Sequence, residues 1–244
     1  MRRILAGTAM ALALTAVTTG CGVGLDAKEV HATEAFPLTG IQLTIKSSLG
    51  GVRVLPGTGT SIEVERWTRG KASNSPTWSL RDGTLRLSAH CTIVFGDCGA
   101  RYHVRVPPTV RLTVETGDDG VILKDLTQDV DVVSRGRIQV SGTSGRLRLR
   151  GEDSPITGDG LKSGGVRART LSGLIDLAFV TPPADLDLQS RDGGVTATVP
   201  RGSYKVTARS TDGTARSELE SAEDGDRTIV ARSTTGHVRV RAAK

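Results

Sequence analysis

Six aspartates lie in or beside glycine-containing turns, where their spacing could support acid–base chemistry. They are Asp118, Asp119, Asp153, Asp159, Asp192 and Asp212. Two carboxylates that face each other across a sugar can serve as general acid and general base. Asp192 and Asp212 occupy equivalent positions in two similar segments, so they could stack one above the other. Asp before Gly is also a common turn dipeptide. We favour the turn interpretation, and the sequence predicts no catalytic residue.

Other catalytic or metal-binding patterns are missing from the sequence. The four histidines (His31, His90, His103 and His237) are scattered, and neither G-x-S-x-G nor H-E-x-x-H occurs. The acidic turns GDDG (117–120) and EDGD (223–226) are single, whereas a calcium-binding β-roll needs a nine-residue array. We therefore expect no cofactor and no metal. An enzyme that acts on polysaccharide through its turn carboxylates is the alternative hypothesis.

Cys91 and Cys98 form the one close cysteine pair in the chain. In an oxidising compartment such a pair usually forms a disulfide. His90 and His103 flank the pair and suggest zinc as an alternative. However, six residues separate the cysteines, whereas paired zinc ligands usually have two to four between them. The sequence therefore favours a disulfide.

The third cysteine, Cys21, follows a segment typical of export. MRR is basic, ILAGTAMALALTAV is apolar over 14 residues, and VTTGC places a small residue directly before the cysteine. This pattern resembles the lipobox of bacterial lipoprotein signals, although Thr18 stands where Leu is commonest. An ordinary secretory signal would instead leave Cys21 as a free thiol. We predict a signal peptide over 1–20, lipidation of Cys21, a tether over 21–35 and an extracytoplasmic location at the cell membrane. Two acyl chains would anchor the chain stably.

A short phrase of Ser or Thr, two residues and Gly recurs along the chain. It starts at Thr170, Ser190, Ser210 and Ser233, at intervals of 20, 20 and 23 residues. The related stretches LTIKSSLGGVRV (43–54) and LDLQSRDGGVTA (186–197) agree at six positions with a constant offset of 143 residues. That offset corresponds to about seven periods of ~20 residues.

Short apolar–polar alternation flanks each phrase and predicts two strands joined by a glycine turn. One such unit cannot bury its apolar face alone, but stacked units form a continuous aliphatic core. We assign the glycines to turns that need a positive φ, and the preceding Ser or Thr to a hydrogen bond with a nearby backbone amide. The turn glycines are Gly50, Gly51, Gly173, Gly193, Gly194, Gly213 and Gly236.

These features predict an all-β fold, a parallel β-solenoid or β-helix-like stack of ~20-residue strand–turn–strand rungs. We expect a single domain over 36–244, with regular repeats over 111–244. Residues 36–110 form a less regular capping part that contains the Cys91–Cys98 loop. Within that part, Asp82-Gly83 predicts an antiparallel hairpin and Pro107-Pro108 a bend.

Repeated strand–S/T-x-x-G–strand units behind a lipoprotein-type signal resemble the bacterial putative-adhesin domain family, long known as a domain of unknown function. The resemblance covers about residues 40–243 and rests on the units at 43–54, 113–124, 170–177, 186–199, 206–214 and 229–240. The unit at 154–161 departs from the pattern. The resemblance implies a β-solenoid at the cell surface and supplies no binding residue.

The sequence thus favours a lipid-anchored, non-catalytic envelope protein over an enzyme. Its solenoid surface would serve adhesion or contact with an envelope protein or glycan. The formal net charge of +6 is spread among interspersed acidic and basic residues, so we expect no nucleic-acid partner. Membrane contact is expected only through the N-terminal lipid.

Overall fold

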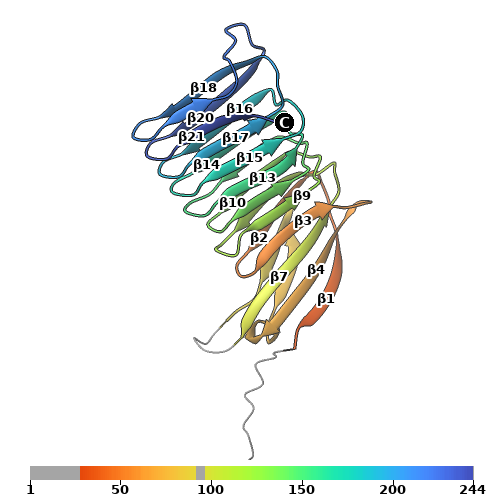
Figure 1. Cartoon of the computed structure of the whole chain (residues 1–244). Helices are drawn as coiled ribbons and strands as arrows, with labels where there is room; N and C mark the ends of the chain where they lie inside the picture. The colour runs from red at the N-terminus through yellow and green to blue at the C-terminus, as the bar shows by residue number, and fades with distance from the viewer. Residues whose placement is uncertain (1–27, 92–96, 244) are drawn as a thin grey trace, which may run out of the picture.

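The computed structural model describes residues 28–91 and 97–243, and this part of the chain is almost entirely β-structure (Figure 1). One sheet has 11 strands, in the order β1 (Val30–Pro37), β4 (Ser61–Gly70), β7 (Cys98–Val106), β3 (Gly51–Pro56), β9 (Val121–Lys124), β11 (Ile138–Ser141), β13 (Ile156–Leu161), β15 (Ile175–Phe179), β17 (Val195–Val199), β21 (Val238–Ala242) and β19 (Ala215–Ser217). The other has 10 strands, in the order β18 (Tyr204–Ser210), β20 (Arg227–Ser233), β16 (Asp185–Ser190), β14 (Gly165–Thr170), β12 (Leu147–Arg150), β10 (Val130–Ser134), β8 (Arg111–Thr116), β2 (Gln42–Ser47), β6 (Thr84–Ser88) and β5 (Thr77–Arg81).

From β8 onward the chain alternates between the two sheets. Each pair of consecutive strands adds one parallel strand to each sheet, as in β8–β9, β10–β11 and β12–β13. Alternate residues point inward, so Leu112, Val130 and Leu147 pack in one aligned row of the 10-stranded sheet. The aliphatic core lies between the sheets and runs along the stack.

The all-β prediction is confirmed, but the sheets are mixed rather than wholly parallel. β1, β4 and β7 pair antiparallel in the larger sheet, as do β5 and β6 in the smaller one. Parallel pairing dominates from β8 onward, where each return of the chain passes through one strand of the opposite sheet. β5 and β6 are joined by a two-residue turn and therefore pair antiparallel. β1, β4 and β7 pair antiparallel although strands of the smaller sheet, β2 and then β5 and β6, lie between them in the chain.

The related stretches at 43–54 and 186–197 lie fewer units apart than their offset suggests. Their first strands, β2 and β16, are separated in the sheet by β8, β10, β12 and β14, which makes five steps rather than about seven. The excess arises because residues after β3 leave the regular stack. They form β4 to β7 before the chain returns at β8, directly beside β2.

The last two units are out of sequence order in space. β20 lies between β16 and β18, and β21 lies between β17 and β19. The C-terminal unit, formed by β20 and β21, therefore lies between the two units that precede it in the chain. As a result, the units that begin at Ser190 and Ser210 are not neighbours.

The N-terminal part contains the irregular elements. Residues 30–35, which we assigned to a tether, belong to β1, so the predicted tether is too long. β1 pairs with β4 over its whole length and contributes Phe36 to the core, which explains why these residues are ordered in the sheet. A short 3-10 helix (η1) covers Lys71–Ser73. The hairpin at Asp82-Gly83 is confirmed, with positive φ at both residues, as a two-residue type I′ turn requires.

Candidate functional site: an arginine-lined groove on the turn ladder

The turns after the strands of the smaller sheet are joined by a ladder of hydroxyl groups. Ser190 Oγ accepts a hydrogen bond from Gly193 N at 2.8 Å and donates one to the Gly173 carbonyl of the neighbouring turn at 3.0 Å. Ser233 repeats both bonds, to Gly236 N and to the Gly193 carbonyl. The hydroxyl therefore closes its own turn and also joins it to the next one.

Close approach of neighbouring turns, rather than a positive φ, explains most of the turn glycines. A Cβ on Gly193 would lie 2.1 Å from the Gly173 carbonyl oxygen, and one on Gly236 would lie 2.2 Å from that of Gly193. Gly173 and Gly213 are similarly crowded by Ser154 and Gly236. Of the seven predicted turn glycines, only Gly50 has a positive φ, so our conformational argument was wrong for the others. Gly51 and Gly194 are less crowded, with carbonyl oxygens 3.2 and 3.4 Å from an added Cβ.

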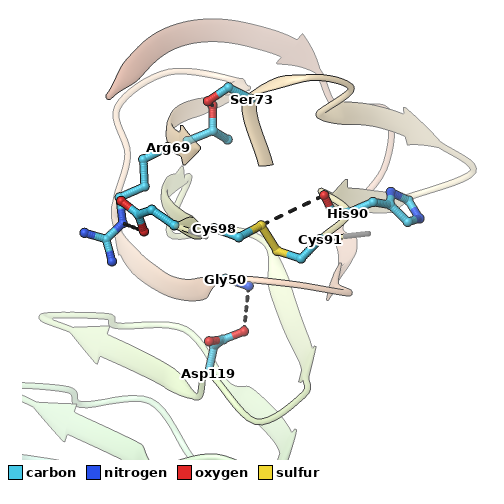
Figure 2. Close-up of a disulfide and its surroundings, with 9 residues drawn as sticks. Gly50, Arg69, Ser73, His90, Cys91, Cys98 and Asp119 are labelled. Carbon is cyan, nitrogen blue, oxygen red and sulfur yellow. Dashed lines mark hydrogen bonds and ion pairs between the residues drawn. A yellow bond between two sulfur atoms is a disulfide. The ribbon is translucent and has the colours of Figure 1, made fainter. Parts of the chain in front are cut away.

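Cys91 and Cys98 form a disulfide, with their Cα atoms 6.0 Å apart (Figure 2). Cys98 is the first residue of β7 and Cys91 follows β6, so the bond joins the ends of strands from the two sheets. The His90 side chain points away from the sulfur atoms in Figure 2. His103 instead packs edge-on against Trp67. Both thiols are therefore used by the disulfide, and the flanking histidines do not converge on it.

The candidate acid–base pair is not assembled. Because β20 lies between β16 and β18, the turn at Thr235 separates Asp192 from Asp212. The Thr235 hydroxyl donates to the Asp192 carbonyl at 3.1 Å, and the Asp192 carboxylate pairs with Arg191. Two strand steps, or about 9.6 Å along the sheet, separate equivalent positions in these turns. The stacked arrangement predicted for the two carboxylates was therefore wrong.

The other turn carboxylates have local roles. Asp118 pairs with Arg135, whose hydrogen bond and charge hold the pKa of the Asp118 carboxyl below its usual range. Asp119 accepts a 2.7 Å hydrogen bond from Gly50 N, which joins the first regular turn to the one stacked beside it (Figure 2). Asp159 lies within β13, and Asp153 lies in the loop before it. Within residues 28–91 and 97–243, no group of three or more His, Cys, Asp or Glu side chains could hold a metal ion.

Outward-facing arginines form a row across the smaller sheet, with each arginine near the C-terminal end of its strand. Arg150 on β12 is in register with Arg169 on β14, which is followed by Gln189 on β16. The row continues with Arg232 on β20 and Arg209 on β18. The inward-facing neighbours on β12, β14 and β20 are buried, whereas those of Arg209 on the edge strand β18 are half-buried. Alternation along each strand leaves all four arginines exposed.

The arginine row borders a groove of about 670 Å³, which we call the basic groove. The other side of the groove is lined by the residues that come directly after the ladder hydroxyls in the chain, namely Leu171, Arg191, Thr211 and Thr234. Its lining contains five arginines and no carboxylate: Arg150, Arg169, Arg191, Arg209 and Arg232. Arg169 and Arg191 pair with Asp187 and Asp192 just outside the groove. The other three make no ion pair with any residue in the described part of the chain.

A second groove on the same sheet also contains several arginines, but there three of the four form ion pairs with aspartates. This paired groove, of about 390 Å³, is lined by Arg111, Asp129, Asp131, Arg146, Arg148, Arg167 and Asp185, among others. Arg146 donates two side-chain hydrogen bonds to Asp129, at 2.9 and 3.1 Å, and lowers the pKa of that carboxyl. Arg148 pairs with Asp131 and Arg167 with Asp187. The two grooves therefore share arginine content but differ in compensating charge.

Sequence reasoning did not find the basic groove. Each arginine is a single residue in an alternating strand, so no one strand contains the cluster. The register of the strands brings the arginines together. An alignment of the repeat units would have placed Arg169, Gln189, Arg209 and Arg232 at the same position, before the hydroxyl, and this was the available signal.

The predicted lipidation site, Cys21, lies outside the described residues. Among the described residues, no helix is long and apolar enough to cross a bilayer.

Comparison with known proteins finds similarity in structure alone. No family model matches the sequence, and no curated protein matches it significantly. A crystal structure of a putative cell adhesion protein from Clostridium sporogenes shares 9% sequence identity, with a TM-score of 0.43, over 88% of this chain and 100% of that one. A putative adhesin from Bacteroides fragilis shares 13% identity, with a TM-score of 0.47, over 86% and 97%. A putative lipid binding protein from Parabacteroides distasonis shares 9% identity, with a TM-score of 0.44, over 86% and 96%.

Proposed function

We propose that this protein is a lipid-anchored, non-catalytic component of the bacterial cell envelope. Its two-sheet stack would act as a rigid β-solenoid that presents an outer surface for adhesion or for contact with a glycan or protein. The observation that carries this proposal is the position of the basic groove. It lies over the strands farthest along the stack from β1, where the described chain begins (Figure 1).

The arrangement supports presentation of a surface away from a membrane. If Cys21 carries lipid, the chain leaves the membrane close to β1, and β18 and β20 lie at the opposite end of the molecule (Figure 1). Each turn is joined to the next by backbone pairing and by the hydroxyl ladder. A continuous core between the sheets stabilises these turns along the stack, so the distal surface is held at a fixed distance from β1.

The test of anchoring is incorporation of a labelled fatty acid in a bacterial host, followed by membrane fractionation. We expect the wild type to carry label and to sediment with membranes, and Cys21→Ala to lose both properties. The Cys91→Ser/Cys98→Ser double variant is the matched control and should keep the label, since those thiols are joined to each other. Equal labelling of Cys21→Ala and wild type would refute lipidation at this residue.

A further inference from the structure

We propose that the basic groove binds a linear anionic polysaccharide that lies across the strands of the smaller sheet. The inference deepens the proposed function. It rests on that function in one respect only, because the protein would meet such a polymer in the cell envelope. The shared chemistry is a carbohydrate chain with regularly spaced acidic groups. These groups would be carboxylates on the sugars or phosphodiesters between sugars or sugar alcohols.

Uncompensated charge is the first argument. Arg232 and Arg209 are directly adjacent across a parallel strand pair, and neither has an ion pair among the described residues. Arg150, which also has none, is adjacent to Arg169, whose partner Asp187 is shared with Arg167. Like charges in opposed positions of a sheet destabilise it. The paired groove shows that this fold can place aspartates beside arginines, as it does with Asp129 and Asp131. Residues that break a local rule without internal compensation often mark a functional site.

Geometry gives the second argument, because the row runs along the stack and not along one strand. From Arg150 to Arg209 it crosses five strands, which at ~4.8 Å per step is about 19 Å. An extended polymer can meet several arginines at once along this line, whereas a small anion would contact only one or two. Guanidinium groups bind both carboxylates and phosphates through paired N–H donors, so both kinds of acidic group fit.

Polar and apolar groups beside the arginines suit a sugar. The exposed side chains of Thr211 and Thr234 lie along the groove and can exchange hydrogen bonds with hydroxyls. The Leu171 side chain is 46% exposed in the same groove, which gives the C–H face of a sugar ring an apolar contact. Gln189 interrupts the arginine row with a neutral side chain that can both donate and accept.

The test measures binding of purified protein to immobilised polygalacturonate, a carboxylate polymer, and to poly(glycerol phosphate), with neutral dextran as a control. The disrupting variant is Arg150→Gln/Arg209→Gln/Arg232→Gln, which removes the three arginines that lack an ion pair. The matched control is Arg146→Gln/Arg148→Gln/Arg167→Gln, which removes the same charge from the paired groove. Thermal unfolding of each variant shows whether it is folded.

We expect wild type to bind at least one acidic polymer and not dextran. The disrupting variant should lose roughly tenfold or more in affinity, while the control should stay within about threefold of wild type. Wild-type affinity should fall with added salt, with a log–log slope of about −2 to −3 for three arginines on a single-stranded polyanion. The acidic polymer that binds more tightly identifies the carboxylate or the phosphodiester source.

Three outcomes would overturn the proposal: no binding to either acidic polymer, equal loss in both triple variants, or equal binding to dextran. Tighter binding of double-stranded DNA than of both polysaccharides would also overturn it. If the disrupting variant is unfolded, the double variant Arg209→Gln/Arg232→Gln takes its place, and wild-type affinity in that variant would overturn the proposal. Loss of acyl labelling leaves these binding results unchanged, so the two proposals fail separately.

Discussion

At the end of the molecule near β1, antiparallel strands, a disulfide and a small aromatic group hold the chain together. At the other end, parallel turns are joined by the same hydroxyl and backbone contacts from one unit to the next. In the first region Phe36 meets Trp78 edge to face, and Arg66 lies 4.0 Å from the Trp78 ring centre. In the second, Ser190 and Ser233 make equivalent bonds in successive turns.

This difference shows how the fold separates stability from surface chemistry. In the regular region, stability rests on inward residues and turn contacts that recur, so outward positions are free to carry a row of like charges. In the irregular region, each contact occurs once. Outward ion pairs occur in both regions, as between Arg105 and Glu65 at the irregular end and between Arg146 and Asp129 in the paired groove. The following changes test this separation.

The largest expected effect comes from a methyl group placed between two turns. Gly193→Ala puts a Cβ 2.1 Å from the Gly173 carbonyl oxygen, so the turns must move apart. We expect the free energy of unfolding to fall by about 3 kcal/mol. Gly194→Ala is the neighbouring control, with a nearest contact of 3.4 Å, and should change the value by less than about 1 kcal/mol. Denaturant unfolding of both variants measures the difference, and equal effects would refute the close-approach argument.

Loss of the disulfide should rank second and act on the irregular region. The bond closes a short loop, with a sequence separation of 7 residues. The chain-entropy relation gives about 2.5 kcal/mol for a loop of this size. We expect Cys91→Ser/Cys98→Ser to lower the unfolding free energy by about 2 kcal/mol, and amide exchange to increase first in β4 and β7. Faster exchange in β16 and β20 instead would contradict the assignment of the bond to the irregular region.

Removal of one ladder hydroxyl should have a smaller effect. Ser190→Ala leaves Gly193 N and the Gly173 carbonyl without their partner, which we expect to cost about 1–2 kcal/mol in unfolding free energy. Ser47→Ala is the matching change in the first turn. There the Ser47 hydroxyl bonds only carbonyl oxygens of its own turn, at 3.0 and 3.2 Å, so we expect less than about 1 kcal/mol. Equal losses in denaturant unfolding would mean that the ladder adds nothing between turns.

The smallest effect at neutral pH is expected at Tyr102, whose buried hydroxyl has no hydrogen-bond partner among the described residues. Tyr102→Phe should therefore be within about 1 kcal/mol of wild type, or slightly more stable. Burial raises the pKa of Tyr102 from 10.0 to about 12. The unfolded chain then loses this proton first, so the contribution of Tyr102 to stability is constant below pH 10 and falls between pH 10 and about 12.

Tyr102→Phe should show a smaller loss of stability over that alkaline range. Tyr204, whose pKa burial also raises, still titrates in the variant, so the comparison is the difference between the two proteins at each pH. Urea unfolding at pH 8 and pH 11 provides it. Parallel pH profiles would show that the Tyr102 hydroxyl is not kept neutral by the fold.

The sequence was most informative where contacts repeat. Alternation around Leu186 and Val195 predicted strands with one buried face, and the Ser-x-x-Gly phrases predicted the turns with their hydroxyl-to-amide bonds. Both are local patterns, so they can be recognised from one unit. The reason for glycine at Gly193 was missed because the crowding group, the Gly173 carbonyl, belongs to another turn.

Long-range order was not predictable in the same way. Nothing in the local sequence shows that β20 inserts between β16 and β18, yet this exchange places Arg232, rather than Arg209, beside Gln189 and separates Asp192 from Asp212. The extension of β1 into the predicted tether is similar. Residues 30–35 show no sustained period, and they form a strand because β4 offers them a complete edge.

The most direct test of the central claim is a titration of arginine-labelled protein with polygalacturonate, followed through the Nε–Hε signals in NMR spectra. If the regular, distal end carries the binding surface, the signals of Arg150, Arg209 and Arg232 should shift together. Those of Arg146, Arg148 and Arg167 in the paired groove should stay in place. Shifts confined to Arg53, Arg101 or Arg105 at the irregular end, or no shifts at a polymer concentration that binds the protein, would contradict the claim.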